Sequence, residues 1–323
     1  MTKGFWENLK KPIMALAPMA DVTDVAFRRV IAKYGKPDVM WTEFVSADGL
    51  VRAPAEGKRK LLKDLEYSEN ERPIVAQLFS SNLQFMEKAA ALCADLGFDG
   101  IDINMGCPDK SIEKQGCGAA MIKNPEVAVE IIRAAHKGAP TLPVSVKTRI
   151  GYNKNELSTW LPALLKEDLA AITIHARTRK EMSNVPARWE HIREALEIRN
   201  NLKSETLILG NGDVVDVLDA QNKCKEFGAD GAMLGRAIFG NPWLFADKNS
   251  KPSLKERLNV MLEHTFLFKE LLGDTKSFAV MKKHYKSYIG EFSGAKELRL
   301  KCMESTNADE VKEVINNFLK TLN

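Results

Sequence analysis

The sequence predicts an α/β protein, a TIM (β/α)8 barrel followed by a small helical domain. Eight short apolar runs of strand length are separated mostly by segments with helical periodicity. Strict alternation of strands and helices produces a parallel sheet, and eight such units can close into a barrel. Polar or reactive residues follow the carboxyl ends of nearly all these runs, and the strand pattern stops after residue 244.

The length and composition agree with this fold class. A chain of 323 residues accommodates a barrel of about 250 residues and an appendage. Its content of hydrophobic residues, 45%, and of charged residues, 28%, is ordinary for a globular protein, and no apolar run is long enough to span a membrane. The first residues lack the layout of a signal peptide, and five cysteines without CxxC or Cys/His spacing argue against disulfides and a metal site. We therefore expect a cytoplasmic protein that binds neither membrane nor metal.

The elements of the barrel follow one another along the chain. The predicted strands occupy residues 12–19, 39–43, 74–79, 100–104, 144–147, 171–175, 207–210 and 231–234. The predicted helices occupy residues 25–34, 82–96, 125–136, 157–167, 189–199 and 214–227. Asp24 or Thr23 can cap the first helix and Gly35 can end it, while Pro125 suits a first helical turn. Residues 46–70 are charged and poorly periodic, which predicts a long irregular excursion on one rim.

A doubly wound open sheet is the alternative to the barrel. An open sheet of that kind gathers its functional residues at one crevice, where the strand order reverses. In this sequence such residues follow nearly every strand instead. The distribution therefore favours the closed barrel, whose strand ends all meet on one rim.

The last part of the chain, residues 246–323, predicts a helical domain beside a barrel of residues 1–245. Its predicted helices occupy residues 254–272, 277–289, 295–303 and 308–322. Residues 276–301 hold seven Lys or Arg against two Glu, and His284, Tyr285, Ser287 and Tyr288 are interleaved with these charges. A solvated helix face explains any single lysine, but the cluster favours a surface that contacts phosphates.

Cys107 is the residue most suggestive of chemistry. The predicted strand at 100–104 breaks into Met105-Gly106-Cys107-Pro108, which places a thiol at the carboxyl end of a strand. The glycine permits a sharp turn and the proline restricts the backbone of the cysteine. The loop around this thiol is polar and contains nothing that would bury it as part of the core. Cys93 and Cys224, in contrast, lie in helical patterns and are expected to be buried hydrophobes.

Other strand ends add a candidate binding site. The segments Asn211-Gly212-Asp213 and Gly235-Arg236 follow strands seven and eight, where barrels commonly bind a phosphate. Lys147 and His175 could close the barrel mouth by hydrogen bonding alone. A lysine in an apolar barrel mouth, however, needs an anionic or carbonyl partner, because an unpaired buried ammonium is costly. The pyrimidine edge of a flavin would offer such a partner.

Several motifs in order carry a family resemblance. They are Ala-Pro-Met-Ala near the start, Met-Gly-Cys-Pro, Lys-Thr-Arg-Ile-Gly, His-Ala-Arg-Thr-Arg, Asn-Gly-Asp and Gly-Arg-Ala-Ile-Phe-Gly-Asn-Pro-Trp. Over about the whole chain the sequence resembles the tRNA-dihydrouridine synthases, with a layout most similar to the bacterial B-type branch. It departs from the family pattern at Ala176, where Gly is common, and at residues 43–45, where a Met-rich segment is frequent.

The resemblance implies an enzyme that binds FMN and tRNA, and we expect the protein to be a monomer. It implies that NADPH supplies electrons and that the C5=C6 bond of a uridine in tRNA is reduced to 5,6-dihydrouridine. The residues implied to bind FMN are Ala17, Pro18, Met19, Gln77, Lys147, His175, Asn211, Gly212, Asp213, Gly235 and Arg236. Cys107 is implied to be the proton donor. The residues expected to contact the substrate are Asn104, Arg149, Arg177, Lys283 and Arg299.

The chemistry of this reaction suits a neutral thiol. Hydride delivered from flavin N5 to C6 of uracil leaves negative charge over C5 and O4, and C5 must then receive a proton. A thiol with a pKa of about 8.5 is mostly protonated at neutral pH and can supply it. A uridine inside folded tRNA must also be turned out to reach a barrel mouth. We therefore expect the basic helical domain to bind the surrounding backbone.

Three other functions remain open from the residues. The first is a flavin reductase that acts on free bases, of the dihydropyrimidine or dihydroorotate kind, against which the basic helical segment counts. The second is a barrel lyase in which Lys147 forms a Schiff base. The third is an RNA-binding factor whose barrel has no activity. No motif indicates which uridine is reduced, and none explains a preference for NADPH, because the sequence has no GxGxxG fingerprint.

Overall fold

The computed structural model describes residues 3–246, 252–290 and 292–321, and it confirms the predicted barrel. All strand pairs are parallel, in the order β1-β9-β8-β7-β6-β5-β4-β2, with β3 also pairing with β4. The strands are β1 (Ile13–Leu16), β2 (Met40–Trp41), β3 (Val45–Ser46), β4 (Ile74–Phe79), β5 (Gly100–Met105), β6 (Val144–Arg149), β7 (Ala171–His175), β8 (Leu207–Asn211) and β9 (Gly231–Leu234). A bridge between Ala15 and Val39 closes the ring between β1 and β2.

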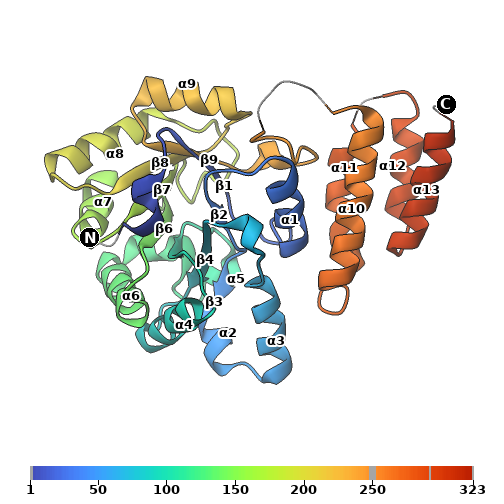
Figure 1. Ribbon diagram of the computed structural model, residues 1–323. Coiled ribbons are helices and arrows are strands. Elements are labelled where there is room, and N and C mark those ends of the chain that lie inside the picture. Colours follow the sequence, from blue (N-terminus) through green and yellow to red (C-terminus); the bar gives the residue numbers. More distant parts are fainter. Residues whose placement is uncertain (1–2, 247–251, 291, 322–323) are drawn as a thin grey trace.

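Helices surround the barrel, and further helices form the C-terminal region, called the helical domain below (Figure 1). Around the barrel lie α1 (Val25–Tyr34), α2 (Ala47–Arg52), α3 (Ala55–Asp64), α4 (Leu83–Asp95), α5 (Lys110–Glu113), α6 (Pro125–Gly138), α7 (Leu157–Leu165), α8 (Glu190–Asn201) and α9 (Val217–Phe227). The C-terminal domain contains α10 (Leu254–Leu272), α11 (Met281–Tyr288), α12 (Ala295–Glu304) and α13 (Ala308–Lys320). The carboxylate of Asp24 caps α1, as predicted, by accepting from the amide of Phe27 at 2.9 Å. None of the helices in the described ranges is long and apolar enough to cross a bilayer.

Two predictions about residues 39–70 are wrong. The predicted strand at 39–43 is shorter, since β2 comprises only Met40–Trp41, and a separate short strand, β3, follows at Val45–Ser46. Glu43 lies between them and pairs with Lys276 of the C-terminal helices. The segment 46–70 is helical rather than irregular. Ser46 caps α2 and Leu50 is buried, while α3 packs through Leu61 and Leu62. The many charges of α3 hide its helical pattern.

The lower part of the barrel interior is filled by side chains. Ala15, Val39, Leu209 and Met233 belong to one buried apolar cluster. Trp41 belongs to the same cluster and packs against Trp6, which precedes the first strand, with ring centroids 6.0 Å apart. The barrel is therefore a packed core whose polar residues are left at the carboxyl ends of the strands.

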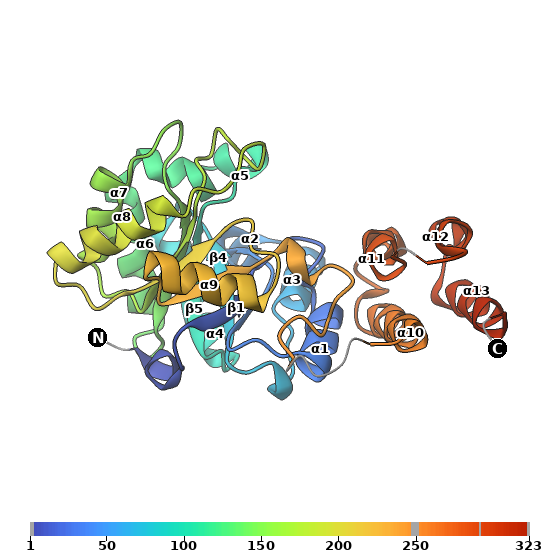
Figure 2. The ribbon, with the colours of Figure 1, turned by 90° about the horizontal axis from the view of Figure 1, so that it is seen from above.

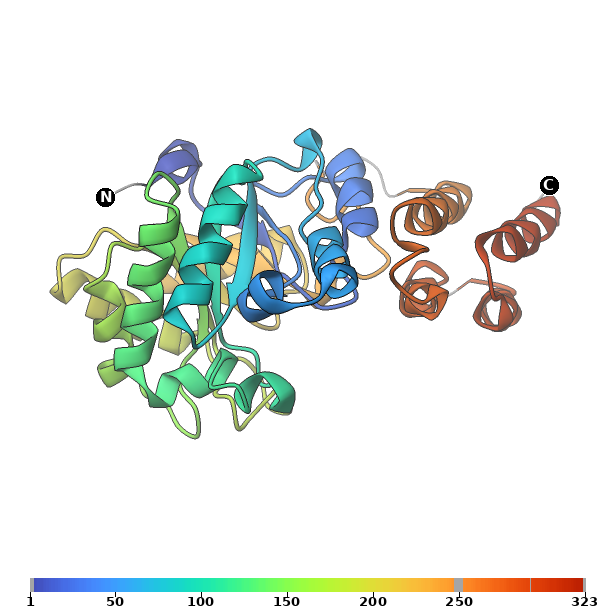
Figure 3. The same ribbon diagram turned by 90° about the horizontal axis from the view of Figure 1, so that it is seen from below.

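The helical domain docks on α1 at the side of the barrel, and Figures 2 and 3 show α12 and α13 farthest from the barrel. Phe27 of α1 stacks on His264 with centroids 4.8 Å apart and contacts His284 edge-on at 4.7 Å. The hydroxyl of Tyr34 donates to Glu263 at 2.6 Å. The predicted boundary at 245/246 adjoins residues 247–251, and the predicted helix end at 322 and Glu291 also lie outside the described residues.

The predicted phosphate-contacting cluster of the helical domain needs correction. Lys276 is not a surface cation, because its Nζ lies 2.6 Å from Glu43 and 3.0 Å from Asp64 of the barrel. His284, Tyr285 and Tyr288 are fully buried and belong to the domain core rather than to a charged surface. The cations that remain exposed or half-buried on this domain are Lys282, Lys283, Lys286, Lys296, Arg299 and Lys301.

Candidate active site

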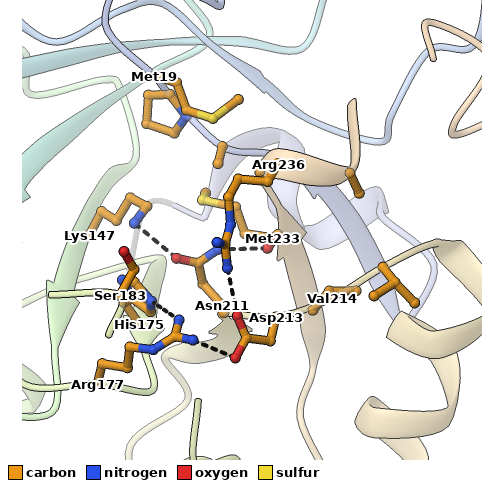
Figure 4. A pocket seen from close by; sticks show the side chains of 16 residues that line it. Met19, Lys147, His175, Arg177, Ser183, Asn211, Asp213, Val214, Met233 and Arg236 are labelled. Carbon is orange, nitrogen blue, oxygen red and sulfur yellow. Dashed lines mark hydrogen bonds and ion pairs between the residues drawn. The ribbon is translucent and has the colours of Figure 1, made fainter. Parts of the chain in front are cut away.

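A cavity of about 650 Å³ lies at the carboxyl ends of the strands, within the size range of small-molecule sites (Figure 4). All of the residues predicted to bind FMN line it, except Gln77. Sequence reasoning missed Ser183, Val214, Val215, Met233 and Ala237. Val214 and Val215 directly follow the Asn-Gly-Asp segment and could have been inferred from it, whereas Ser183 lies in a loop without a distinguishing pattern.

Lys147 lines this cavity and presents its ammonium there. Its Nζ lies 3.2 Å from Oδ1 of Asn211, whose Nδ2 donates to the carbonyl of Met233 at 2.8 Å. Burial lowers the pKa of Lys147 to about 8, and the Arg149 guanidinium acts in the same direction. Asp102 and Cys107 act in the opposite direction. The ammonium therefore prevails at neutral pH and would gain from a carbonyl or anionic partner in the cavity.

His175, Arg177 and Asp213 form a second group on the wall (Figure 4). Arg177 is 2% exposed; its Nη1 lies 3.0 Å from Nε2 of His175, and its Nη2 pairs with Asp213. Burial, with the nearby cations Arg149 and Lys147, holds the pKa of His175 well below its usual value. Because a guanidinium only donates, Nε2 of this neutral imidazole accepts and Nδ1 carries the proton.

The ends of β8 and β9 offer free backbone donors. Within the described chain, the amides of Gly212, Asp213, Gly235 and Arg236 donate to no acceptor. A side chain at Gly212, whose φ is +122°, would place its Cβ 2.8 Å from Cβ of Ala187. The guanidinium of Arg236 adds positive charge and lies 2.7 Å from Asp213. This combination of amides and a cation is suited to an anion such as a phosphate.

Cys107 lies on the same side of the barrel as Lys147. Gly106 crosses β6 so closely that an added Cβ would be 3.2 Å from Cα of Thr148, and Lys147 pairs in register with Asn104 of β5. Cys107 is half-buried against the cluster of Phe79, Ile112 and Cys117, and it is not part of the core, as expected.

The thiol of Cys107 is protonated at neutral pH. Burial raises its pKa above the ordinary value, although Lys147 and Arg149 act in the opposite direction. Burial raises the pKa of the neighbouring Cys117 to about 11. Cys93 and Cys224 are buried, as predicted. Cys107 is therefore the most accessible of the five thiols and retains a proton that it could donate.

The other predicted site residues lie outside the lining of the cavity. Arg149 is 7% exposed, and it donates to the carbonyl oxygens of Gly106 at 2.8 Å and of Thr178 at 3.1 Å. Arg149 thus joins the turn at residues 105–108, called the cysteine turn, to the loop after β7. Lys283 on α11 is exposed and Arg299 on α12 is half-buried, both on the helical domain. Gln77 and Asn104 are buried beside the cysteine turn.

Comparison with known proteins places the chain in a family. Residues 15–323 match the family model described as dihydrouridine synthase (Dus). The chain belongs to the dihydrouridine synthase family. It is 40% identical over 320 residues to a probable tRNA-dihydrouridine synthase 2 of Bacillus subtilis (strain 168), covering 98% of this chain and 97% of that one. It is 39% identical over 321 residues to a probable tRNA-dihydrouridine synthase of Staphylococcus epidermidis, with the same coverage of both chains.

Solved structures confirm the barrel fold of this dihydrouridine synthase. A 2-naphthoyl-CoA reductase in complex with 2-naphthoyl-CoA aligns with a TM-score of 0.55 at 13% identity, covering 74% of this chain and 52% of that one. A histamine dehydrogenase from Rhizobium sp. 4-9 aligns with a TM-score of 0.51 at 11% identity, covering 79% and 48%. At these identities the likeness concerns the fold alone.

Proposed function

We propose that this family member is a tRNA-dihydrouridine synthase that uses FMN, with NADPH as electron source, to reduce the C5=C6 bond of a uridine in tRNA. The observation that carries the proposal is the joint placement of a protonated thiol, Cys107, and an ammonium, Lys147, at one rim of the barrel. The curated relatives are named as probable tRNA-dihydrouridine synthases over nearly their full length, which supports the same substrate class.

The cavity residues fit FMN. The Lys147 ammonium would bind the carbonyl edge of the ring system, which supplies the partner that this buried cation needs. The free amides of residues 212, 213, 235 and 236 would hold the phosphate. Ala17, Pro18 and Met19 would provide the apolar floor. When bound, FMN supplies the hydride that C6 of the uracil ring receives.

The chain itself supplies the proton. The sulfur of Cys107 carries a proton at neutral pH, because burial raises its pKa. We assign to this thiol the transfer of a proton to C5 of the uracil ring, as a general acid. Asn104, Arg149 and Arg177, which surround the cysteine turn and the cavity wall, would act on the substrate side.

The helical domain would bind the body of the tRNA. The base must leave the folded RNA to reach the cavity, and the energetic cost of this is offset by contacts to the backbone. Residues 246–323 would make these contacts through surface cations that include Lys283 and Arg299, while residues 1–245 carry the chemistry. We propose that the protein acts as a monomer in the cytoplasm.

Spectroscopy of the purified protein tests this function. The protein should bind FMN, its flavin absorbance should be bleached by NADPH, and unmodified tRNA should restore the absorbance while dihydrouridine forms. Free uracil and fully modified tRNA are the controls and should restore little absorbance. Failure to bind FMN, or reoxidation by free uracil as fast as by tRNA, would reject the proposal.

A further inference from the structure

A chain of hydrogen bonds runs from a buried carboxylate to the backbone amide of Cys107. Asp102 on β5 is 1% exposed, and its Oδ2 accepts from Nε2 of Gln77 at 2.6 Å. Oε1 of Gln77 accepts from Nδ2 of Asn104 at 3.2 Å. Oδ1 of Asn104 accepts from the amides of Cys107, at 2.9 Å, and of Gly106, at 3.2 Å.

The two ends of this chain fix the orientation of both side-chain amides. The amide groups of Gln77 and Asn104 can each donate on one side and accept on the other, so alone they permit two orientations. An ionised carboxylate only accepts, and a backbone amide only donates. Asp102 therefore requires the Gln77 nitrogen to face it, and Cys107 requires the Asn104 oxygen to face it. These two requirements agree, and every link has one donor and one acceptor.

Neighbouring strands hold the carboxylate in place. Asp102 pairs in register with Gln77 of β4 and with Ser145 of β6, and Oγ of Ser145 donates to Oδ1 of Asp102 at 2.5 Å. Burial raises the pKa of Asp102 to about 6, while hydrogen bonds from Ser145 and Gln77 and the charge of Lys147 lower it. The carboxylate is therefore mostly ionised at neutral pH and remains an acceptor.

We propose that Asp102 and Gln77 are positioning residues that set the orientation of the Cys107 turn, through Asn104. This inference rests on the proposed function in one respect, namely that Cys107 is the proton donor. It also gives Gln77 a role besides any contact with FMN, because both of its polar atoms are engaged away from the cavity lining.

Gln77→Met tests the chain by removing both of its central hydrogen bonds at nearly constant volume. Dihydrouridine formation should fall about tenfold or more, because small displacements of a reacting group are costly. Reduction of the bound flavin by NADPH, measured on the FMN-loaded variant, should fall less than dihydrouridine formation, because Gln77 does not line the cavity. The rate at which iodoacetamide alkylates Cys107 is followed by mass spectrometry. This alkylation rate should change together with the rate of dihydrouridine formation and not with the rate of flavin reduction.

A double variant tests the direction of the hydrogen bonds. In Asp102→Asn combined with Gln77→Glu, the new amide donates to the new carboxylate, whose other oxygen accepts from Asn104, so the chain to Cys107 is restored. Alkylation and dihydrouridine formation should return to within about threefold of wild type. Should Gln77→Met fail to fold, Gln77→Glu alone provides the test. In this variant the carboxyl group introduced at position 77 lies next to that of Asp102. The two groups can share one proton in acid, which preserves the hydrogen bond between them, but not in alkali. The alkylation rate of Cys107 relative to wild type should therefore change as pH rises.

Asp230→Asn is the matched control, since Asp230 is a buried carboxylate that accepts from Arg199 and from the amide of Ile208 at the other end of the barrel. It should leave the alkylation of Cys107 unchanged. Wild-type alkylation in Gln77→Met, or no recovery in the double variant, would overturn the inference. Failure of the proposed function would look different, because the wild-type protein would then form no dihydrouridine while the alkylation results still held.

Discussion

Lys276→Met should destabilise the protein by detaching the helical domain from the barrel rim. Lys276 lies in the loop after α10, and its ammonium contacts Glu43 at 2.6 Å and Asp64 at 3.0 Å, with Asp21 at 3.8 Å. The side chains of Lys276 and Glu43 are only 15% and 6% exposed. Removing the cation would leave a buried carboxylate that no other cation in the described chain contacts as an ion pair.

The cost can be worked out from these contacts. Removing one partner of a buried ion pair costs about 3–5 kcal/mol, and we expect the lower end, about 3 kcal/mol at neutral pH, because Glu43 can take up a proton. Burial raises the pKa of Glu43 to about 7 even with Lys276 present. The unfolded value is about 4.3, so the folded protein binds more protons between these values, and acidification through this window favours the folded state. The loss in Lys276→Met should therefore shrink in acid.

Urea unfolding followed by tryptophan fluorescence measures this loss near neutral pH and at about pH 5, where Glu43 is protonated in the folded state. Lys269→Met is the control, because Lys269 and Asp309 are 52% and 68% exposed and such surface pairs contribute about 0–1 kcal/mol. If Lys276→Met loses no more stability than this control near neutral pH, or loses as much in acid, then the ionic contact does not hold the domain.

Three further variants and one control variant test the site. Lys147→Met should weaken FMN binding by about 2 kcal/mol in a fluorescence titration, as expected for a hydrogen bond from a charged group. The wild-type affinity should fall as pH rises through the pKa of about 8 and that of the variant should not; equal pH profiles would contradict this role. Gly212→Ala should cost about 1–3 kcal/mol of FMN affinity through strain and contact with Ala187. Gly228→Ala, also at positive φ but 3.7 Å from its nearest neighbour, should leave that affinity intact. Cys117→Ala should keep dihydrouridine formation, since burial raises the pKa of this thiol to about 11; loss of product at normal folding would give Cys117 a chemical role.

Much of the barrel and its site could be predicted because the deciding signals are local. Apolar runs separated by helical segments define the strands, and Asp24 and Asn82 cap the helices that follow them. Since the carboxyl ends of parallel strands share one rim, residues such as Lys147 and Asn211, which are 64 positions apart, could be assigned to one site without a structure.

Prediction from sequence fails where tertiary contacts decide. The interleaved charges predict that His284, Tyr285 and Tyr288 belong to a charged surface, yet with Met281 they form the buried stripe of α11 at helical spacing, a pattern that the sequence does contain. The sequence around Lys276 does not indicate that three carboxylates of the barrel surround its ammonium. Gln77 was identified as a site residue, but its partners Asp102 and Asn104 depend on the register of β4 and β5, which only the structure provides.

The role of Cys107 as the proton donor is tested most directly by a single turnover of Cys107→Ala. The FMN-loaded variant is first reduced with NADPH and then mixed with unmodified tRNA, and both the return of flavin absorbance and the dihydrouridine formed are measured. Reduction by NADPH should match the wild type, while dihydrouridine should form about 10²–10⁴-fold more slowly, the usual contribution of a general acid. Formation of dihydrouridine at the wild-type rate and yield would contradict the assignment.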